Sequence, residues 1–240
     1  MSNFVITIDG PAGSGKSTVA RKVANKLGLI HLNSGVLYRA LALKAMESGI
    51  SLADDSLLTG LVSELDFKVK LEDQVRTVLL VDDEDVDSEV VGDIGGRIKN
   101  AGEGASQVAV HKGVREALTQ VQRNLAKGHS VILEGRDAGT VVFPDAQFKF
   151  YLDANLETRI KRRHKELIGQ ELVGQAKGMP SEAQASEAQV REELTKRDHR
   201  DATRKIAPQV PAKDAIIIDT SSLSVDEVVE KICVFININF

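Results

Sequence analysis

Residues 10–17 carry the clearest chemical pattern, because Gly-Pro-Ala-Gly-Ser-Gly-Lys-Ser satisfies G-x-x-x-x-G-K-[ST] at every defined position. Glycines let backbone N–H groups curl around an anion, and a helix that follows adds its positive N-terminus. We expect Lys16 to reach the β- and γ-phosphates of a nucleoside triphosphate, and the Ser17 hydroxyl to ligate Mg²⁺. A chance glycine-rich turn is disfavoured, because the pattern also lies between an expected strand and an expected helix. The predicted ATP-binding residues of this loop are Gly10, Pro11, Ala12, Gly13, Ser14, Gly15, Lys16, Ser17 and Thr18.

Residues 195–205, TKRDHRDATRK, concentrate positive charge in a chain whose net charge is −4. The charged residues are Lys196, Arg197, Arg200, Arg204 and Lys205, with Asp198 and Asp201 among them. A solvated helix face is the ordinary explanation for such a run. The alternative is that the arginines face phosphate groups and that the aspartates hold the arginines in place.

A second candidate loop, Asn33-Ser-Gly-Val-Leu-Tyr-Arg39, follows a short apolar segment and leads into an expected helix. Ser34 would lie near the N-cap of this helix, a position that suits an anion. Arg39 could clamp a phosphate and Tyr38 could pack on a ring. The competing interpretation places Tyr38 in the core and Arg39 on the surface.

A third candidate loop, Glu134-Gly-Arg-Asp-Ala-Gly-Thr140, follows the apolar run SVILE. Parallel sheets bind ligands in loops at the carboxyl ends of their strands. Glu134 could therefore hold a Mg²⁺-bound water, and Arg136 and Asp137 would project into the binding crevice.

The elements that would position these loops alternate between short apolar strands and amphipathic helices. The expected strands are 4–8, 29–32, 130–134, 147–152 and 214–219, and the expected helices are 18–27, 36–47, 107–126, 155–168, 182–198 and 225–236. Such alternation predicts an α/β fold with a mostly parallel sheet that helices cover on both faces.

Two regions interrupt the alternation. Residues 66–105 contain FKVKL and RTVLLV, typical of a small antiparallel insert, followed by a connection rich in glycine that we expect to be mobile (Gly92, Gly95, Gly96, Gly102 and Gly104). Residues 165–190 are polar, and SEAQASEAQ at 181–189 repeats a five-residue unit. We interpret this second region as part of an exposed helical flap that is mobile without ligand.

Composition excludes several classes of protein. Cys233 is the only cysteine, so the chain can form neither an internal disulfide nor a cysteine-based zinc site, and a reducing cytoplasm fits best. Its mild acidity argues against a nucleic-acid or membrane binder. The apolar run at 232–240 is shorter than the ~20 residues of a membrane span and is expected to end a packed helix. We expect a monomer.

A GTPase switch is disfavoured by two incomplete motifs. Asn25-Lys26-Leu27-Gly28 lacks the aspartate of a guanine-reading Asn-Lys-x-Asp and lies inside the first expected helix. Asp93-Ile-Gly-Gly96 matches D-x-x-G in letters only, because it falls in the glycine-rich connection.

Together these motifs resemble the nucleoside monophosphate kinases, most closely the bacterial cytidylate kinase family, over about residues 4–232. That family has the same phosphate loop, then [ST]-G-x-x-Y-R, G-R-D-x-G-T-x-V-x-P and R-D-x-R-D-x-x-R. Here these are residues 34–39, 135–144 and 197–204. The resemblance implies a P-loop kinase core with a five-stranded parallel sheet, formed by 1–65 and 106–240. It also implies an antiparallel insert at 66–105 that binds the nucleoside monophosphate, and a helical lid at about 155–205.

The resemblance also implies a reaction, the ATP-dependent phosphorylation of CMP and dCMP with Mg²⁺. Catalytic roles would fall to Lys16, Arg136, Arg197 and Arg204, and triphosphate contacts to Arg159 and Arg163 in RIKRRHK, a run that could otherwise be a solvated face. The monophosphate would meet Ser34, Arg39, Arg136 and Arg204, the sugar Arg197 and Asp201, and the base Ser106, Arg115 and Asp137. The rivals are a small P-loop kinase acting on AMP, UMP or a metabolite such as shikimate, and a nucleotide-dependent binding module.

The sequence departs from the family pattern at one of these loops. Asn33 stands where the family often has aspartate, so a carboxylate role at that position is lost. The connection at 88–105 and the flap at 165–190 are longer than usual.

Overall fold

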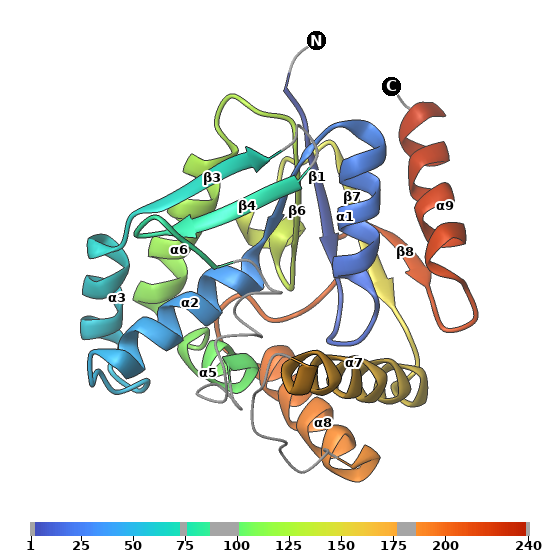
Figure 1. Ribbon diagram of the computed structural model, residues 1–240. Helices are drawn as coiled ribbons and strands as arrows, with labels where there is room; N and C mark the ends of the chain where they lie inside the picture. Colours follow the sequence, from blue (N-terminus) through green and yellow to red (C-terminus); the bar gives the residue numbers. More distant parts are fainter. Residues whose placement is uncertain (1–2, 73–75, 87–100, 177–185, 239–240) are drawn as a thin grey trace.

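The computed structural model describes residues 3–72, 76–86, 101–176 and 186–238, and its centre is a five-stranded parallel sheet (Figure 1). The strands are β1 (Val5–Asp9), β2 (Ile30–Asn33), β6 (Val131–Gly135), β7 (Phe148–Asp153) and β8 (Ile216–Asp219). Their order is β2-β6-β1-β7-β8, and every neighbouring pair is parallel. The predicted α/β fold is confirmed, with all five strands close to their expected ranges.

The central strands β1 and β6 are buried on both faces. Ile6 and Ile8 of β1 are fully buried, and so are Val131, Ile132 and Leu133 of β6. A strand with only one covered face would alternate buried and exposed residues, whereas every residue of 6–9 in β1 and of 131–135 in β6 is buried.

Helices α1 (Lys16–Leu27) and α9 (Val225–Ile238) cover one face of the sheet. Val19 and Val23 of α1 pack with Val228 and Ile232 of α9 over β1 and β7. The C-terminal apolar run thus belongs to a packed helix as far as residue 238, as expected. None of the described helices combines the length and apolar character needed to cross a bilayer.

The other face of the sheet is covered by α6 (Lys112–Ala126) and the π-helical turn η1 (Ala138–Val142). Three further helices pack outside these two elements: α2 (Ser34–Glu47), α3 (Asp55–Glu64) and α5 (Ala101–Val108). The single helix expected at 107–126 is two helices, which meet at His111. The His111 ring nitrogen Nε2 lies 2.8 Å from the carbonyl oxygen of Leu52. Helix α3 was missed.

Two glycines that were expected in a mobile connection lie in helix α5 instead, and that prediction was wrong for Gly102 and Gly104. A Cβ at Gly104 would lie 3.2 Å from the Cβ of Ala42, so glycine allows α5 to approach α2 closely. Gly92, Gly95 and Gly96 lie outside the described residues. The expected boundary between 105 and 106 falls inside α5, and the division into domains stays a prediction.

The predicted antiparallel insert is present as β3 (Phe67–Glu72), β4 (Arg76–Val81) and β5 (Glu84–Asp85). Its apolar face packs against α2, where Val36 and Ala40 are buried with Val81 and Val86. The hydroxyl of Thr77 on β4 accepts a hydrogen bond from the backbone N–H of His31 on β2 at 3.0 Å. The insert therefore rests on the edge strand of the core sheet.

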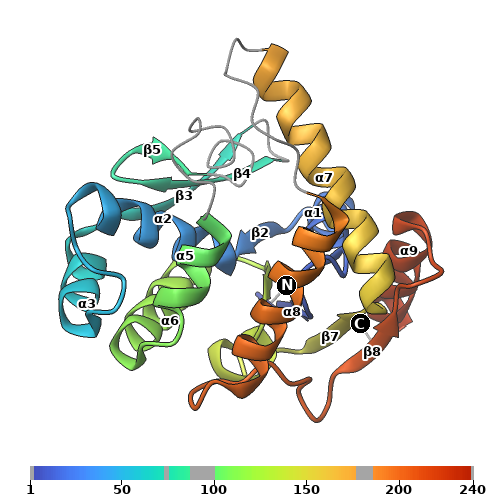
Figure 2. The ribbon, with the colours of Figure 1, turned by 90° about the horizontal axis from the view of Figure 1, so that it is seen from below.

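Helices α7 (Leu156–Ala176) and α8 (Glu187–Thr203) pass below the carboxyl ends of the strands (Figures 1 and 2). Val190 and Leu194 of α8 pack on Ile160 of α7 and on Ala12 of the phosphate loop. Ser186 begins α8 with a capping box to Gln189. The helices expected at 155–168 and 182–198 are present as α7 and α8, with different ends. Residues 177–185, which include most of the SEAQASEAQ repeat, lie outside the described residues.

Candidate active site

The phosphate loop joins β1 to α1 in a conformation that glycine makes possible. The φ angles of Gly10, Gly13 and Gly15 are 152°, 76° and 88°. A Cβ at Gly10 would lie 2.1 Å from the carbonyl oxygen of Leu152, and one at Gly13 would lie 2.9 Å from that of Arg159. Helix α1 begins at Lys16, so its free N–H groups face the inside of the loop.

Lys16 lies over this loop, and its Nζ donates to the carbonyl oxygen of Pro11 at 3.0 Å. The side chain is buried, and burial together with the nearby Arg136 guanidinium holds the pKa of Lys16 well below its usual value. A desolvated ammonium group near other cations is stabilised by an anionic ligand.

Glu134 lies near the end of β6, opposite Ser17. The Ser17 hydroxyl donates to Glu134 Oε2 at 2.7 Å, and His31 Nε2 lies 3.1 Å from Glu134 Oε1. Burial alone would raise the pKa of Glu134, but His31, Lys16 and Ser17 outweigh it and the pKa is lowered. The site therefore holds an ionised carboxylate beside a hydroxyl.

Five cations form a basic cluster around this point, namely Lys16, Arg39, Arg136, Arg163 and Arg197. Burial first, and then the charge of Arg136, lowers the pKa of Arg197 to about 10. Burial likewise lowers the pKa of Arg39. Such mutual destabilisation of positive charges is relieved when a polyanion such as a phosphate group binds.

A second group, the Arg–Asp cluster, consists of Arg115, Asp137, Asp201 and Arg204. Arg115 Nη2 donates to Asp137 Oδ2, and Arg204 Nη2 lies 3.6 Å from Asp137 Oδ1. Tyr38 borders the cluster: the Arg115 guanidinium lies 5.8 Å from the centre of the Tyr38 ring. Burial raises the pKa of Tyr38 to about 12, so the ring stays neutral. The buried Ser106 hydroxyl has no hydrogen-bond partner within the described part of the chain.

Asp201 joins the two clusters. Its Oδ2 accepts from Arg136 Nε at 3.2 Å, and its Oδ1 lies 3.8 Å from Arg204 Nη1. The structure thus brings Arg136, Asp137, Asp201 and Arg204 together from segments far apart in the sequence. Arg204 lies with the Arg–Asp cluster, and its role as a phosphate clamp stays a prediction.

The expected triphosphate contacts, Arg159 and Arg163, differ in their surroundings. Arg159 Nη1 donates to the carbonyl oxygen of Ala12 at 3.2 Å and to Asp198 Oδ2 at 2.6 Å. Arg163 pairs with Glu166 at 3.0 Å on the same helix. Arg159 therefore supports the outside of the phosphate loop, and contacts of either residue with ATP stay predictions.

Both aspartates of residues 195–205 bind arginines of other segments, Asp198 binding Arg159 and Asp201 binding Arg136. The expectation that they hold the arginines of their own segment has one contact in its favour, Arg204 Nη1 at 3.8 Å from Asp201 Oδ1. Lys196, by contrast, is exposed and pairs only with its helical neighbour Glu192 among described residues. The segment thus lines the candidate site with Asp198 and Asp201, while Lys196 lies on a solvated face.

The sequence reasoning missed four residues that shape the site: Asp9, His31, Arg162 and Thr220. Asp9 accepts from the backbone N–H groups of Ala138 and Gly139, each at 2.8 Å. The sequence feature that could have identified Asp9 is its position at the end of β1, directly before the phosphate loop.

Arg162 and Thr220 fix the loop from its other side. The Thr220 hydroxyl donates to the carbonyl oxygen of Ser14 at 2.9 Å, and Arg162 Nη2 donates to the carbonyl oxygen of Thr220 at 2.6 Å. Arg162 follows Arg159 by three residues, a spacing that places both on one face of the helix, whereas no sequence motif marks Thr220.

A family model and the sequence relatives of this chain agree on one family. A family model described as Cytidylate kinase matches residues 6–237. The Cytidylate kinase of Haemophilus ducreyi is 41% identical over 232 residues, which cover 96% of this chain and 95% of that protein. The Cytidylate kinase of Methylococcus capsulatus is 42% identical over 228 residues, which cover 94% of this chain and 93% of that protein. A solved shikimate kinase from Acinetobacter baumannii is 17% identical with a TM-score of 0.44, covering 99% of this chain and 95% of that one, a likeness that carries no inference.

Proposed function

The chain belongs to the cytidylate kinase family, and from that premise we propose that it transfers the γ-phosphoryl group of ATP to CMP and dCMP, forming CDP and dCDP. The observation that carries the proposal is the pair of clusters joined by Asp201 beside the phosphate loop. One cluster has the charge to bind phosphates, and the other has the carboxylate and guanidinium groups to read a base.

ATP binds through the phosphate loop, whose backbone N–H groups surround the β-phosphate while Lys16 reaches toward the γ-phosphate. Lys16 must then exchange its hydrogen bond to Pro11 for a phosphate oxygen. Arg159, Arg162 and Thr220 hold the loop from outside, so its shape does not depend on that bond.

Ser17 and Glu134 fit a Mg²⁺ ion, since hydroxyl and carboxylate oxygens are the ligands this ion prefers. Their oxygens already lie 2.7 Å apart, and the lowered pKa of Glu134 keeps its carboxylate ionised. Ser17 would bind the ion directly and Glu134 through a water. When bound, the ion offsets the charge of the phosphates.

CMP binds across the crevice. Its phosphate meets Arg39, Arg136 and Arg204 with Ser34 beside them, and its sugar meets Arg197 and Asp201. Asp137 Oδ1 accepts from the exocyclic amine of cytosine, and Arg115 and Ser106 donate to the ring acceptors. The buried Ser106 hydroxyl, which lacks a partner among described residues, supports this placement.

Catalysis requires no general base, because the attacking oxygen belongs to a phosphate that is already anionic. The residues of the basic cluster position the two phosphates and stabilise the charge that spreads over the transferred group. Helices α7 and α8 would close over this site and exclude water, since Ala12 already packs against them.

The remaining parts of the proposal concern its setting. We place the enzyme in a reducing cytoplasm, because its one cysteine, Cys233, is a buried free thiol. We expect it to act as a monomer without nucleic acid or membrane.

The test is a panel of nucleoside monophosphates incubated with MgATP, with ADP formation as the readout. CMP and dCMP should support steady ADP formation, and AMP and UMP much less. If AMP, UMP or shikimate were the preferred phosphoryl acceptor, the protein would have the activity of another small P-loop kinase. Absence of ADP with every acceptor would favour a binding module.

A further inference from the structure

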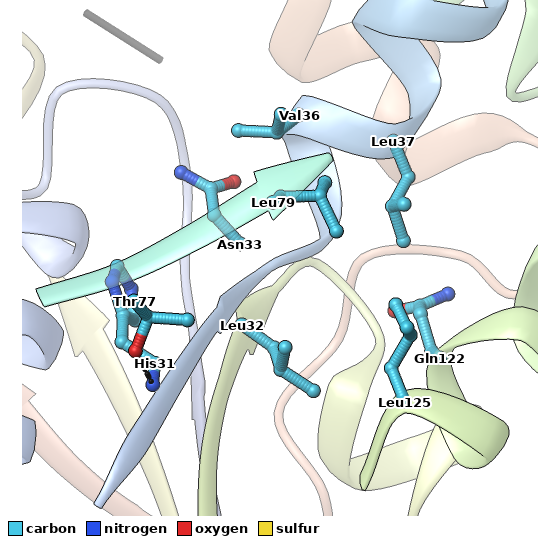
Figure 3. A pocket seen from close by; sticks show the side chains of 9 residues that line it. All are labelled: His31, Leu32, Asn33, Val36, Leu37, Thr77, Leu79, Gln122 and Leu125. Atoms are coloured by element: carbon cyan, nitrogen blue, oxygen red, sulfur yellow. Dashed lines mark hydrogen bonds between the residues drawn. The ribbon is translucent and has the colours of Figure 1, made fainter. Parts of the chain in front are cut away.

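A pocket lies between the core sheet and the insert, where β2, β4, α2 and α6 meet (Figure 3). His31 and Thr77 lie at one end of it, and Gln122 and Leu125 at the other, as Figure 3 shows. His31 lines this pocket, and its ring nitrogen Nε2 also lies 3.1 Å from Glu134 Oε1.

Sheet geometry places the His31 ring on the face that carries Glu134. Asn33 pairs with Glu134 in the register of β2 and β6, and His31 pairs with Ile132. Because side chains alternate along a strand, His31, Asn33 and Glu134 project from the same face. The Thr77 hydroxyl fixes the main chain of His31 at 3.0 Å, so the ring approaches Glu134 from a constrained backbone.

The two oxygens of Glu134 have different partners. Oε1 contacts His31 Nε2 at 3.1 Å, and Oε2 accepts from the Ser17 hydroxyl at 2.7 Å. An ionised carboxylate only accepts hydrogen bonds, so Nε2 carries the proton in this contact. His31 thereby occupies Oε1 of Glu134, and Oε2 stays directed toward Ser17.

We propose that His31 is a positioning residue that holds Glu134 in the orientation needed for Mg²⁺·ATP binding. The proposal deepens the proposed function and rests on it. The oxygen donors Ser17 and Glu134 would hold the ion, and His31 would touch neither the ion nor the nucleotide.

The surroundings of Glu134 explain why such a residue is needed. Its side chain is only 1% exposed, so water cannot replace a lost donor at Oε1. Lys16 and Arg39 are its cationic neighbours. Without His31, the carboxylate would turn toward these cations to satisfy Oε1, and Oε2 would leave Ser17. Loss of such a supporting hydrogen bond typically costs 10–100-fold in metal affinity.

The experiment compares binding of a non-hydrolysable ATP analogue with and without Mg²⁺, by titration calorimetry, in His31→Leu, His31→Gln and the unsubstituted protein. The ratio of the two dissociation constants measures the gain from the metal. We expect His31→Leu to reduce this gain about 10-fold or more. His31→Gln should stay within a few-fold of the unsubstituted protein, since its amide nitrogen reaches about as far as Nε2. His129→Leu, at an exposed position before β6, is the matched control and should change nothing.

Two further readouts separate this role from a structural one. The CMP affinity and the thermal midpoint of unfolding should be similar in His31→Gln and the unsubstituted protein. His31→Gln therefore keeps the proposal testable even if His31→Leu folds poorly. An unchanged metal gain in His31→Leu would overturn the proposal, and so would equal losses in the Leu and Gln variants. The binding experiment contains no phosphoryl acceptor, so its results do not depend on whether the protein phosphorylates CMP. The proposed function is tested separately, by the phosphorylation assay with the unsubstituted protein.

Discussion

Arg200 on α8 and Glu103 on α5 form a two-pronged ion pair, with Nη1–Oε2 and Nη2–Oε1 distances of 3.0 and 2.7 Å. Helix α5 carries Ser106, and α8 carries Arg197 and Asp201. A Cβ at Gly102 would lie only 3.3 Å from Arg197 Nη1, so the two helices approach closely at the same point. The ion pair therefore holds the proposed base-binding residue Ser106 close to the proposed sugar-binding residues Arg197 and Asp201.

Reversing this pair should raise the KM for CMP. Glu103→Arg or Arg200→Glu alone places like charges together, and we expect an increase of about 3- to 10-fold, corresponding to about 0.6–1.4 kcal/mol for a half-exposed bidentate pair. The KM for ATP should change less, because neither residue contacts the phosphate loop. The double variant, which restores opposite charges, should recover much of the loss in steady-state assays.

A matched control for that prediction lies on the same helix. Glu192 and Lys196 of α8 form an exposed pair at i,i+4 spacing, with side chains 65% and 68% exposed. Reversing their charges should leave both KM values unchanged. If the Glu103 and Arg200 variants behaved like this control, the link between α5 and α8 would have no part in CMP binding.

Asp137→Asn should narrow the preference for CMP over UMP. Asp137 Oδ2 is occupied by Arg115, which leaves Oδ1 to accept from the amine of cytosine. Uracil presents an acceptor at that point, and two facing acceptors cost about 1.5–3 kcal/mol, or roughly 10- to 150-fold in kcat/KM. An asparagine amide can donate to uracil instead. The CMP:UMP ratio of kcat/KM should therefore fall, while ATP binding stays nearly constant.

The competing view is that Asp137 only orients Arg115 and Arg204. In that case Asp137→Asn would lose activity on CMP and UMP in equal proportion. An unchanged ratio would exclude the base-reading role.

The fold was predictable because its central strands are short apolar runs and its helices have clear apolar spacing. Errors occurred where packing overrides local signals. Gly102 and Gly104 are poor helix formers, yet they lie in α5 because small residues allow close contact with α2 and Arg197. The division of 107–126 at His111 depends on a contact with Leu52, more than fifty residues away.

The candidate site was predictable where a short motif carries its chemistry, as at Lys16 and Arg136. The supporting contacts were not, because they join distant segments. Asp198 reaches Arg159, and Thr220 reaches the carbonyl oxygen of Ser14, through the tertiary fold alone. The assignment of individual residues to ATP and CMP still rests on the family motifs.

Lys16→Ala should lower kcat by about 10²–10³-fold and change the affinity for CMP little. Its charge matters most while the phosphoryl group moves, as for other groups that stabilise developing charge. Lys22→Ala is the matched control, since Lys22 lies on the same helix and pairs with Asp226 at the surface. Near-normal turnover of Lys16→Ala in a coupled ADP assay would contradict the phosphate-loop assignment.

Asp9 couples the phosphate loop to residues 138 and 139 through a buried carboxylate. Burial raises its pKa from 3.8 to about 6, although the N–H groups of Gly139 and Ala138 oppose the shift. In the unfolded chain the same group titrates near its ordinary value. Between these two values the folded protein holds a proton that the unfolded chain has released.

The contribution of Asp9 to stability should therefore fall as pH rises from about 4 to 7. A folded pKa above the unfolded one means that the folded state binds more protons in this window, so the free energy of unfolding decreases with pH. The shift from 3.8 to about 6 corresponds to at most about 3 kcal/mol. Asp9→Asn removes the titration, so urea unfolding of both proteins at pH 4.5, 5.5 and 7 isolates the effect from other groups. The stability of the unsubstituted protein relative to Asp9→Asn should decrease across this series, and a difference that is constant with pH would show that the Asp9 pKa is not raised.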